Sequence, residues 1–194
     1  MNIGIFGGTF DPIHIGHLII AEQAWQSAGL DEVWFIPAAS PPHKPGQDIT
    51  PAEHRVEMVR LAIRDHPKFR LSTVELQRPG PSYTVDTVRQ LCAQHPRDRF
   101  FLIVGGDMVN DLPNWYKIEE ILQMVDIIGH ARPGTTTDAL PPEIAEKVIW
   151  VRDPVTVNVS STQIRRQLAS GASARYLLPE PVRKYIKGKR LYGT

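Results

Sequence analysis

Short apolar runs alternate with longer segments of helical periodicity along this chain of 194 residues. This alternation restricts the possible folds more than any other feature of the sequence. The apolar runs have the length of β-strands, and such an alternation is typical of a parallel sheet covered by helices. We therefore expect one α/β domain over residues 1–194, Rossmann-like and doubly wound, with a mainly parallel sheet and helices on both faces. Strands are expected at residues 3–6, 33–37, 69–71, 100–104, 125–129 and 148–151.

Helix signals lie between these strands. The first helix carries an apolar stripe from Ile15 and ends near Gly29, which suits a left-handed cap. The second should open at Thr50, with Pro51 at the first helical position and Glu53 completing a capping box, and run to about residue 65. Three more helices are expected after Thr84, around residues 118–123, and from residues 160–162 to just before Gly171.

Charge and cysteine content limit the kinds of partner. The chain has 22 Lys and Arg against 21 Asp and Glu, so no bulk field draws it to nucleic acid or to a membrane, and any anion must be bound locally. Cys92 is the single cysteine, which excludes an internal disulfide and makes the cytoplasm the default location. No signal peptide or bilayer-length apolar segment is evident. An oligomer is possible but not predicted.

A phosphate-binding turn is expected directly after the first strand, where residues 7–17 read Gly-Gly-Thr-Phe-Asp-Pro-Ile-His-Ile-Gly-His. Gly7 and Gly8 permit a tight turn, and the start of the next helix presents free amides and a positive dipole end to an anion. His14 and His17 are three residues apart, so they project from one helix face and can touch one phosphate. Gly16 leaves room for a base or a ribose. The alternatives are surface or capping histidines, or a zinc site for which no matching ligand set is present.

Three further segments offer phosphate or ribose contacts. Residues 159–165 place hydroxyls at a predicted helix start, where they are also expected as caps, and Arg165 one turn later could clamp a phosphate pair. Lys44 lies in a proline-rich loop after the second strand and is either a mobile charge for a phosphate or simply solvated. Asp107 follows two glycines after the fourth strand, where a carboxylate could accept hydrogen bonds from ribose hydroxyls or merely stabilise a turn.

The stretches 7–17 and 160–165 resemble the H-x-G-H and S-S-T-x-I-R signatures of the nucleotidyltransferase superfamily. The resemblance implies histidines that bind a nucleotide triphosphate and stabilise the transition state, with no covalent nucleophile. It also implies that a C-terminal helical region of about residues 160–190 completes an ATP site. The ATP-binding residues it implies are Gly7, Gly8, Thr9, Phe10, Gly16, Asp107, Ser160, Ser161 and Thr162.

Within the superfamily, nearly the whole chain is similar to the bacterial nicotinate-nucleotide adenylyltransferases, through residues 82–84, 114–116 and 132–133 as well as both signatures. That similarity implies a nicotinate-nucleotide subsite, in which an aromatic ring stacks on the pyridine and backbone amides hold its carboxylate. Packing in the core or at its rim is the alternative for these aromatic residues. The residues implied for this subsite are Tyr83, Thr84, Trp115, Tyr116 and Arg132.

The implied reaction is in-line attack by the phosphate of nicotinate mononucleotide on the α-phosphorus of ATP, with pyrophosphate leaving. A phosphate monoester with a second pKa of about 6 is already ionised near neutrality, so no general base is needed. His14, His17, Lys44 and Arg165 are the catalytic candidates, and Mg²⁺ should travel with ATP because no carboxylate cage is apparent.

The alternatives are a related adenylyltransferase, acting on nicotinamide mononucleotide or phosphopantetheine, and a non-catalytic nucleotide-binding module. The basic run at residues 183–190 could touch RNA, or could be a solvated helix end.

Overall fold

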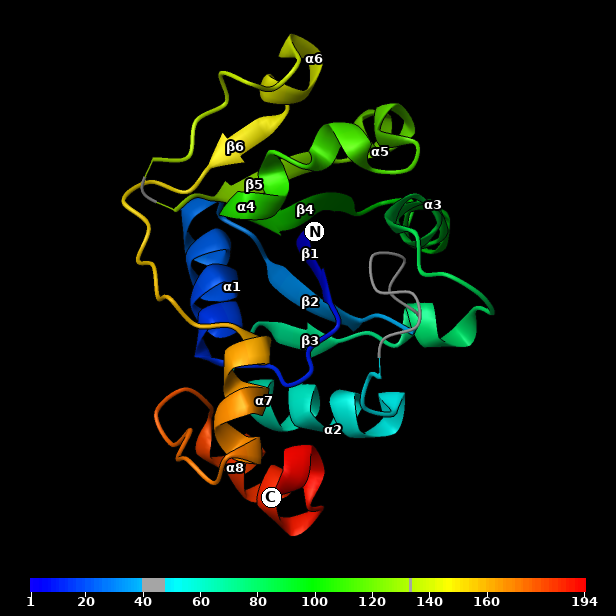
Figure 1. Cartoon of the computed structure of the whole chain (residues 1–194). Helices are drawn as coiled ribbons and strands as arrows, with labels where there is room; N and C mark the ends of the chain where they lie inside the picture. Colours follow the sequence, from blue (N-terminus) through cyan, green and yellow to red (C-terminus); the bar gives the residue numbers. More distant parts are fainter. Residues whose placement is uncertain (40–47, 133) are drawn as a thin grey trace.

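The computed structural model describes residues 1–39, 48–132 and 134–194, which contain a six-stranded sheet with all neighbouring strands parallel (Figure 1). The strand order is β3-β2-β1-β4-β5-β6, and the expected α/β class and all six expected strands are confirmed. The strands are β1 Asn2–Gly8, β2 Glu32–Pro37, β3 Phe69–Leu71, β4 Arg99–Gly105, β5 Asp126–His130 and β6 Val148–Trp150.

The five expected helices are present, and the described residues add α4, α6, α8 and three short 3-10 turns. Gly29 has a φ of 60°, as a left-handed helix cap requires. The helices are α1 Ile15–Ser27, α2 Ala52–Ile63, α3 Thr84–Gln94, α4 Gly106–Val109, α5 Ile118–Met124, α6 Pro142–Ala145, α7 Ser161–Ala169 and α8 Glu180–Gly188; the 3-10 turns are η1 Val74–Gln77, η2 Leu112–Asn114 and η3 Leu191–Gly193. No helix of the described ranges is long and apolar enough to span a membrane.

The expected capping box at the start of α2 is wrong. Pro51 is itself the N-cap, and no side chain caps the helix. The backbone N–H of Thr50 instead donates to the carboxylate of Asp11, 3.1 Å away. The long-range hydrogen bond to Asp11 therefore occupies the Thr50 N–H that the expected capping box would have used.

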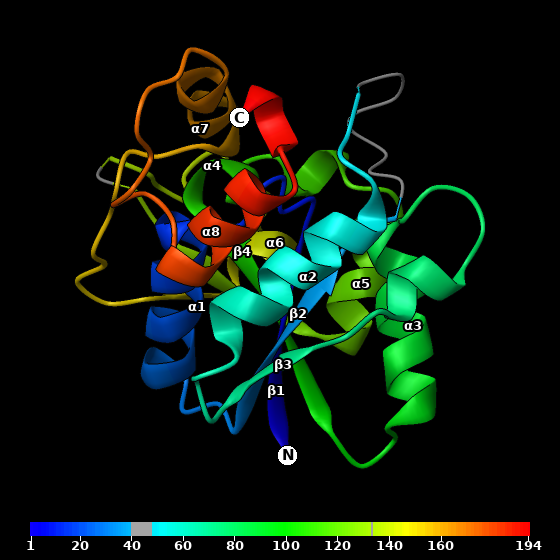
Figure 2. The same cartoon turned by 90° about the horizontal axis from the view of Figure 1, so that it is seen from below.

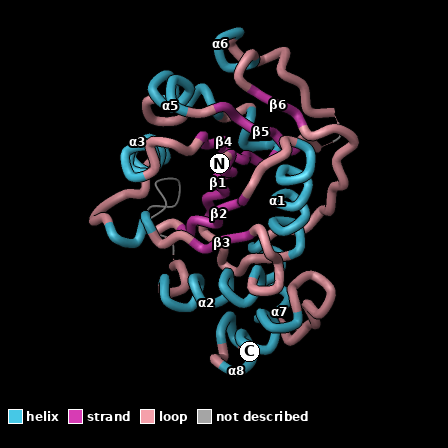
Figure 3. The backbone as a smooth tube through the Cα atoms, turned by 180° about the vertical axis from the view of Figure 1, so that it is seen from behind, coloured by secondary structure: helices cyan, strands magenta, loops and turns pink. Residues whose placement is uncertain are grey.

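Two hydrophobic cores lie on opposite faces of the sheet. Figures 1 and 3 show the helices that cover the two faces. Successive strand residues alternate between them, so that Phe6 packs with α1, α2, α7 and α8, whereas Ile5 packs with α3 and α5. Val182 and Ile186 are fully buried in the first core and hold α8 against it. The basic run 183–190 lies on α8 and in the turn that follows.

The order of the strands reverses between β1 and β4, because β2 and β3 extend from one side of this pair and β5 and β6 from the other. Crossover helices leave the carboxyl ends of β1 and β4 on opposite faces, which opens the crevice where ligands bind in such sheets. Figure 2 shows α7 and the C-terminus beyond these strand ends. The sheet therefore directs the search to this edge.

Candidate nucleotide site

A cleft of about 340 Å³ lies at the carboxyl edge of the sheet on the α1 face. It collects residues that are far apart in the sequence but were predicted to act together. The start of α1 contributes His14, Gly16 and His17, α4 contributes Asp107, and the start of α7 contributes Ser160, Ser161, Thr162 and Arg165.

The two histidines cap the helix and line the cleft at the same time. His14 is the N-cap of α1, and its Nδ1 accepts from the Gly16 N–H at 3.0 Å. The Nδ1 of His17 accepts in turn from the His14 N–H at 3.1 Å, and the two rings stack with centroids 3.8 Å apart. A neutral ring whose Nδ1 accepts carries its proton on Nε2. The helix start thus sets the same tautomer in both rings, with the proton on Nε2 of each.

Burial lowers the pKa of His14 from 6.5 to about 4. His14 therefore stays neutral near pH 7 and offers a hydrogen bond to a phosphate without adding a charge. Its side chain is only 6% exposed, so protonation inside the fold lacks compensation from water.

This pKa predicts acid sensitivity of folding. Between pH 6.5 and 4 the unfolded chain protonates His14 and the folded chain does not, so the free energy of unfolding falls as pH falls, by about 3 kcal/mol near pH 4. Urea unfolding at a series of pH values measures this slope. His14→Asn keeps an acceptor for Gly16 and does not titrate, so its slope should be shallower; an equal slope in both proteins contradicts the prediction.

The glycines of this segment have a packing function that the sequence interpretation did not include. A Cβ on Gly16 would lie 2.8 Å from His14 Cε1 and 2.9 Å from Val159 Cγ1, so the missing side chain makes room for the histidine ring. A Cβ on Gly8 would lie 3.0 Å from the ring of Phe10, which is 2% exposed. The Phe10 side chain therefore belongs to the core, where it packs edge-on against His17 at 5.1 Å.

Gly7 and Gly8 continue β1 in register with β2 rather than forming a separate loop. Neither glycine, nor Thr9 or Phe10, lines the cleft. The carbonyl of Thr9 accepts from the Arg55 guanidinium at 2.9 Å.

The start of α7 is fastened to the segment that precedes α1. Ser160 is the N-cap and accepts from the Gln163 N–H at 3.1 Å. Ser161 Oγ donates to the carbonyl of Pro12 at 2.9 Å, and Arg165 Nη1 donates to the carbonyl of Asp11, also at 2.9 Å. These bonds hold the second signature against the first, so one cleft contains both.

Arg132, predicted for nicotinate-nucleotide binding, lies apart from the aromatic residues predicted with it. It lines the same cleft as the two histidines, and its Nη1 is 3.6 Å from the Asp107 carboxylate. Both side chains are more than half exposed, so this ion pair is weak and open to exchange with a ligand. The binding of the nicotinate nucleotide by Arg132 stays a prediction.

Two residues at this edge were missed. His130, the last residue of β5, lines the cleft, and its Nε2 is 2.7 Å from Gln23 Oε1, which also accepts from the Val155 N–H. Its position directly after an apolar strand was a signal for it. Arg55 is 2% exposed and donates to the carbonyls of residues 9, 38 and 50, which ties together the segments after β1 and β2. Nothing in its local sequence indicates this.

The aromatic residues predicted for the second subsite lie on the other face of the sheet, at the start of α3 and before α5. The rings of Tyr83 and Tyr116 are 4.7 Å apart, and Tyr116 is 53% exposed. Trp115 packs against the second core, and its buried Nε1 has no hydrogen-bond partner in the described part of the chain. Tyr83 is the N-cap of α3 without a side-chain cap bond, so amides of the first turn, which begins at Thr84, face outward.

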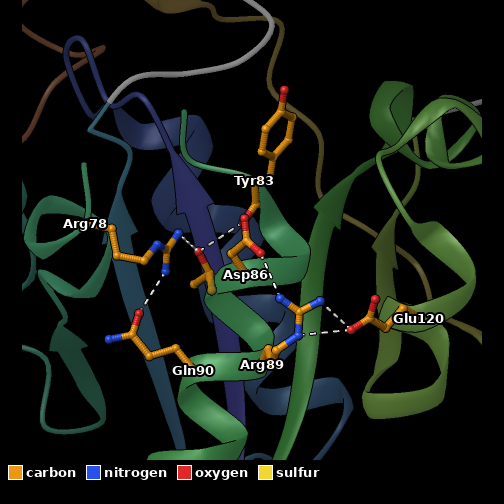
Figure 4. A network of polar contacts seen from close by, with 7 residues as sticks. Arg78, Tyr83, Asp86, Arg89, Gln90 and Glu120 are labelled. Atoms are coloured by element: carbon orange, nitrogen blue, oxygen red, sulfur yellow. Dashed lines mark hydrogen bonds and ion pairs between the residues drawn. The ribbon is translucent and has the colours of Figure 1, made fainter. Parts of the chain in front are cut away.

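Polar contacts hold this end of α3 in place. Figure 4 shows the Tyr83 ring standing beyond the helix start and away from the ion pairs below it. Arg89 pairs with Asp86 on its own helix and with Glu120 of α5. Arg78 donates to Thr87 on the opposite side of the helix.

Lys44, predicted for phosphate binding, falls within residues 40–47 and lies outside the described residues.

The fold, with its cleft at the strand reversal, defines a nucleotide-binding α/β protein, and a cytidylyltransferase-like family model matches residues 5–167. Nicotinate-nucleotide adenylyltransferase of Bacillus subtilis is 46% identical over 98% of this chain and 98% of its own length. The Geobacillus thermodenitrificans protein named "Probable nicotinate-nucleotide adenylyltransferase" is 48% identical over 100% of this chain and 87% of its own. The chain belongs to the nicotinate-nucleotide adenylyltransferase family.

Solved structures agree on the fold. The Plasmodium falciparum nicotinic acid mononucleotide adenylyltransferase, complexed with NaAD, superposes with a TM-score of 0.81 over 98% of this chain and 97% of its own, at 21% identity.

Proposed function

We propose that this chain transfers the adenylyl group of ATP to nicotinate mononucleotide, releasing pyrophosphate and forming nicotinate adenine dinucleotide. The observation that carries the proposal is that His14, His17 and Arg165 line one cleft, with both histidine rings held in place by the start of α1. Neutral N–H donors and a guanidinium suit a polyphosphate, since they stabilise charge without needing to accept a proton.

The arrangement supports a donor site and an acceptor site on opposite faces of the sheet. ATP would occupy the cleft, with its triphosphate toward the two histidines and Arg165. Nicotinate mononucleotide would lie by the rings of Tyr83 and Tyr116, with its phosphate directed across the strand reversal toward the α-phosphorus. An oriented pair of reactants supplies much of the rate acceleration, and an ionised phosphate nucleophile needs no base.

Mg²⁺ enters this proposal as part of MgATP. The cleft holds one carboxylate, Asp107, which already pairs with Arg132, and the described residues contain no group of three His, Cys, Asp or Glu side chains suited to a metal. Such a donor set does not fit a resident ion, so phosphate oxygens would supply the ligands. Four expectations stay predictions: a catalytic function of Lys44, completion of the ATP site by about residues 160–190, one domain over residues 1–194, and a cytoplasmic location.

The test is pyrophosphate release from MgATP with a panel of acceptors: nicotinate mononucleotide, nicotinamide mononucleotide and phosphopantetheine. We expect release that depends on a pyridine mononucleotide, together with a dinucleotide product identified by mass. Release with phosphopantetheine alone would assign a different transferase, and nucleotide binding without any release would leave only a binding module.

Arg165→Lys should be damaging although it keeps the charge. The Arg165 guanidinium already donates one N–H to the Asp11 carbonyl, and a planar fork has further donors for a phosphate, whereas an ammonium group cannot keep both in that geometry. We expect kcat/KM for MgATP to fall on the order of tenfold to a hundredfold, equivalent to about 1.5–3 kcal/mol for a charged hydrogen bond. Arg166→Lys, one residue along and exposed, is the matched control. Wild-type constants in Arg165→Lys would show that the guanidinium is not needed.

A further inference from the structure

Asp11 is the point where three distant parts of the chain meet. The residue is 4% exposed, and its carboxylate accepts from the Thr50 N–H through Oδ2 and from the Tyr192 hydroxyl through Oδ1. Its backbone carbonyl accepts from Arg165 Nη1 at 2.9 Å. One buried residue thus joins the segment before α2 and the last residues of the chain to the guanidinium in the cleft.

The end of the chain has a conformation that brings Tyr192 to this point. Tyr192 has a φ of 57° and a ψ of 27°, a left-handed conformation that residues other than glycine rarely adopt. Gly193 follows with a φ of 80°, and a Cβ there would lie 3.5 Å from Cα of Ala169 at the end of α7. Figures 1 and 2 show the C-terminal turn beside α7 and α8. The turn therefore packs against the helix that carries Arg165.

The direction of the Arg165 side chain depends on the position of the Asp11 carbonyl. Its one other hydrogen bond among the described residues is to Thr162 Oγ1, at 3.4 Å, which is long and lies on its own helix. The Asp11 bond therefore dominates the placement of the guanidinium. The carbonyl is in turn held by the two hydrogen bonds that fix the carboxylate of the same residue.

We propose that Tyr192 is a positioning residue for the donor nucleotide: its hydroxyl fixes Asp11, and the Asp11 carbonyl aims Arg165 into the cleft. Tyr192 does not line the cleft. The inference rests on the proposed function, because it takes Arg165 to bind the phosphates of ATP.

The test is Tyr192→Phe, which removes the hydroxyl and keeps the ring. We expect KM for MgATP to rise about five- to tenfold, the effect of one hydrogen bond, with KM for nicotinate mononucleotide unchanged. Tyr185→Phe is the matched control, since its hydroxyl bonds to His54 Nδ1 at 2.8 Å, between α8 and α2, and does not contact Asp11. Its constants should stay within twofold of wild type. Calorimetric titration of each folded variant with MgATP alone measures the Kd and the fraction of competent sites. The Kd for MgATP should rise in Tyr192→Phe by the same factor as KM and stay unchanged in Tyr185→Phe.

A double variant separates positioning from general loosening. If Tyr192 acts through Arg165, the Tyr192→Phe penalty in kcat/KM for MgATP should largely vanish in an Arg165→Lys background, because coupled residues are not additive. A penalty that persists in full in the double variant, or constants in Tyr192→Phe equal to those of Tyr185→Phe, would overturn the inference while the adenylyl transfer of the wild type stands. A wild-type protein that transfers no adenylyl group would overturn the proposed function and this inference with it.

Discussion

Turnover in His17→Ala is expected to fall by about a hundredfold or more, the loss typical of one donor that acts on transition-state charge. The His17 Nδ1 accepts from the His14 N–H, which leaves the ring proton on Nε2, and the ring is held in place by its stack on His14. Alanine removes this donor and also the acceptor for the His14 N–H, which is half of the reciprocal His14–His17 capping box at the start of α1. Some stability should be lost as well, about 1 kcal/mol for a helix cap.

Two further variants separate catalysis from capping. Asparagine at position 17 keeps an acceptor for the His14 amide but places no N–H at the Nε2 position, so His17→Asn should recover stability and not turnover. Glutamine reaches the Nε2 position with an N–H, so His17→Gln should recover part of the turnover. Single-turnover rates and thermal unfolding measure the two effects. Near-normal turnover in a folded His17→Ala protein would show that the histidine only caps the helix.

The strands and most helices were predictable because their signals are local. An apolar run such as residues 100–104 needs a buried strand whatever surrounds it, and the stripe from Ile15 needs a covered helix face. The start of α2 was not predictable in the same way. Its threonine can form a capping box only if its backbone is free, and here that backbone is bonded to Asp11.

The residues of the candidate site also divide into those with a local sequence signal and those whose position depends on distant parts of the chain. The spacing of His14 and His17 fixed their common face, and the serine at position 160 acts as the cap that its residue type suggested. The position of Arg132 in the cleft was not predictable, because sequence alone does not say which face of the sheet the loop after β5 reaches. Arg55 and Tyr192 were missed, since their function comes from carbonyl and carboxylate groups far along the chain.

The acceptor preference is the largest effect that the proposal predicts, and the start of α3 supplies its physical reason. No side chain caps this helix, so the Thr84 and Val85 amides at its start are N–H donors next to Tyr83, whose ring lies 4.7 Å from that of Tyr116. A ring carboxylate accepts from such donors, and the helix dipole favours its charge. The neutral amide of nicotinamide mononucleotide places an NH₂ donor against them, which leaves polar groups unpaired.

We therefore expect kcat/KM, at saturating MgATP, to favour nicotinate over nicotinamide mononucleotide by roughly 10⁴-fold, as sites built around a specific hydrogen bond do. Thr84→Pro tests the origin of the preference, because proline is tolerated at the first helical position and lacks the backbone N–H. It also lacks the threonine hydroxyl, so Thr84→Ala, which loses the hydroxyl and keeps the N–H, is the control. Tyr83 before it is extended, with a ψ of 135°, as a residue preceding proline must be. Thr84→Pro should reduce the ratio of the two kcat/KM values on the order of tenfold to a hundredfold, the value of a charged hydrogen bond, whereas Thr84→Ala should not change it. A wild-type ratio near one would reject the nicotinate assignment and leave adenylyl transfer standing. An unchanged ratio in Thr84→Pro would move the source of the preference away from the Thr84 amide.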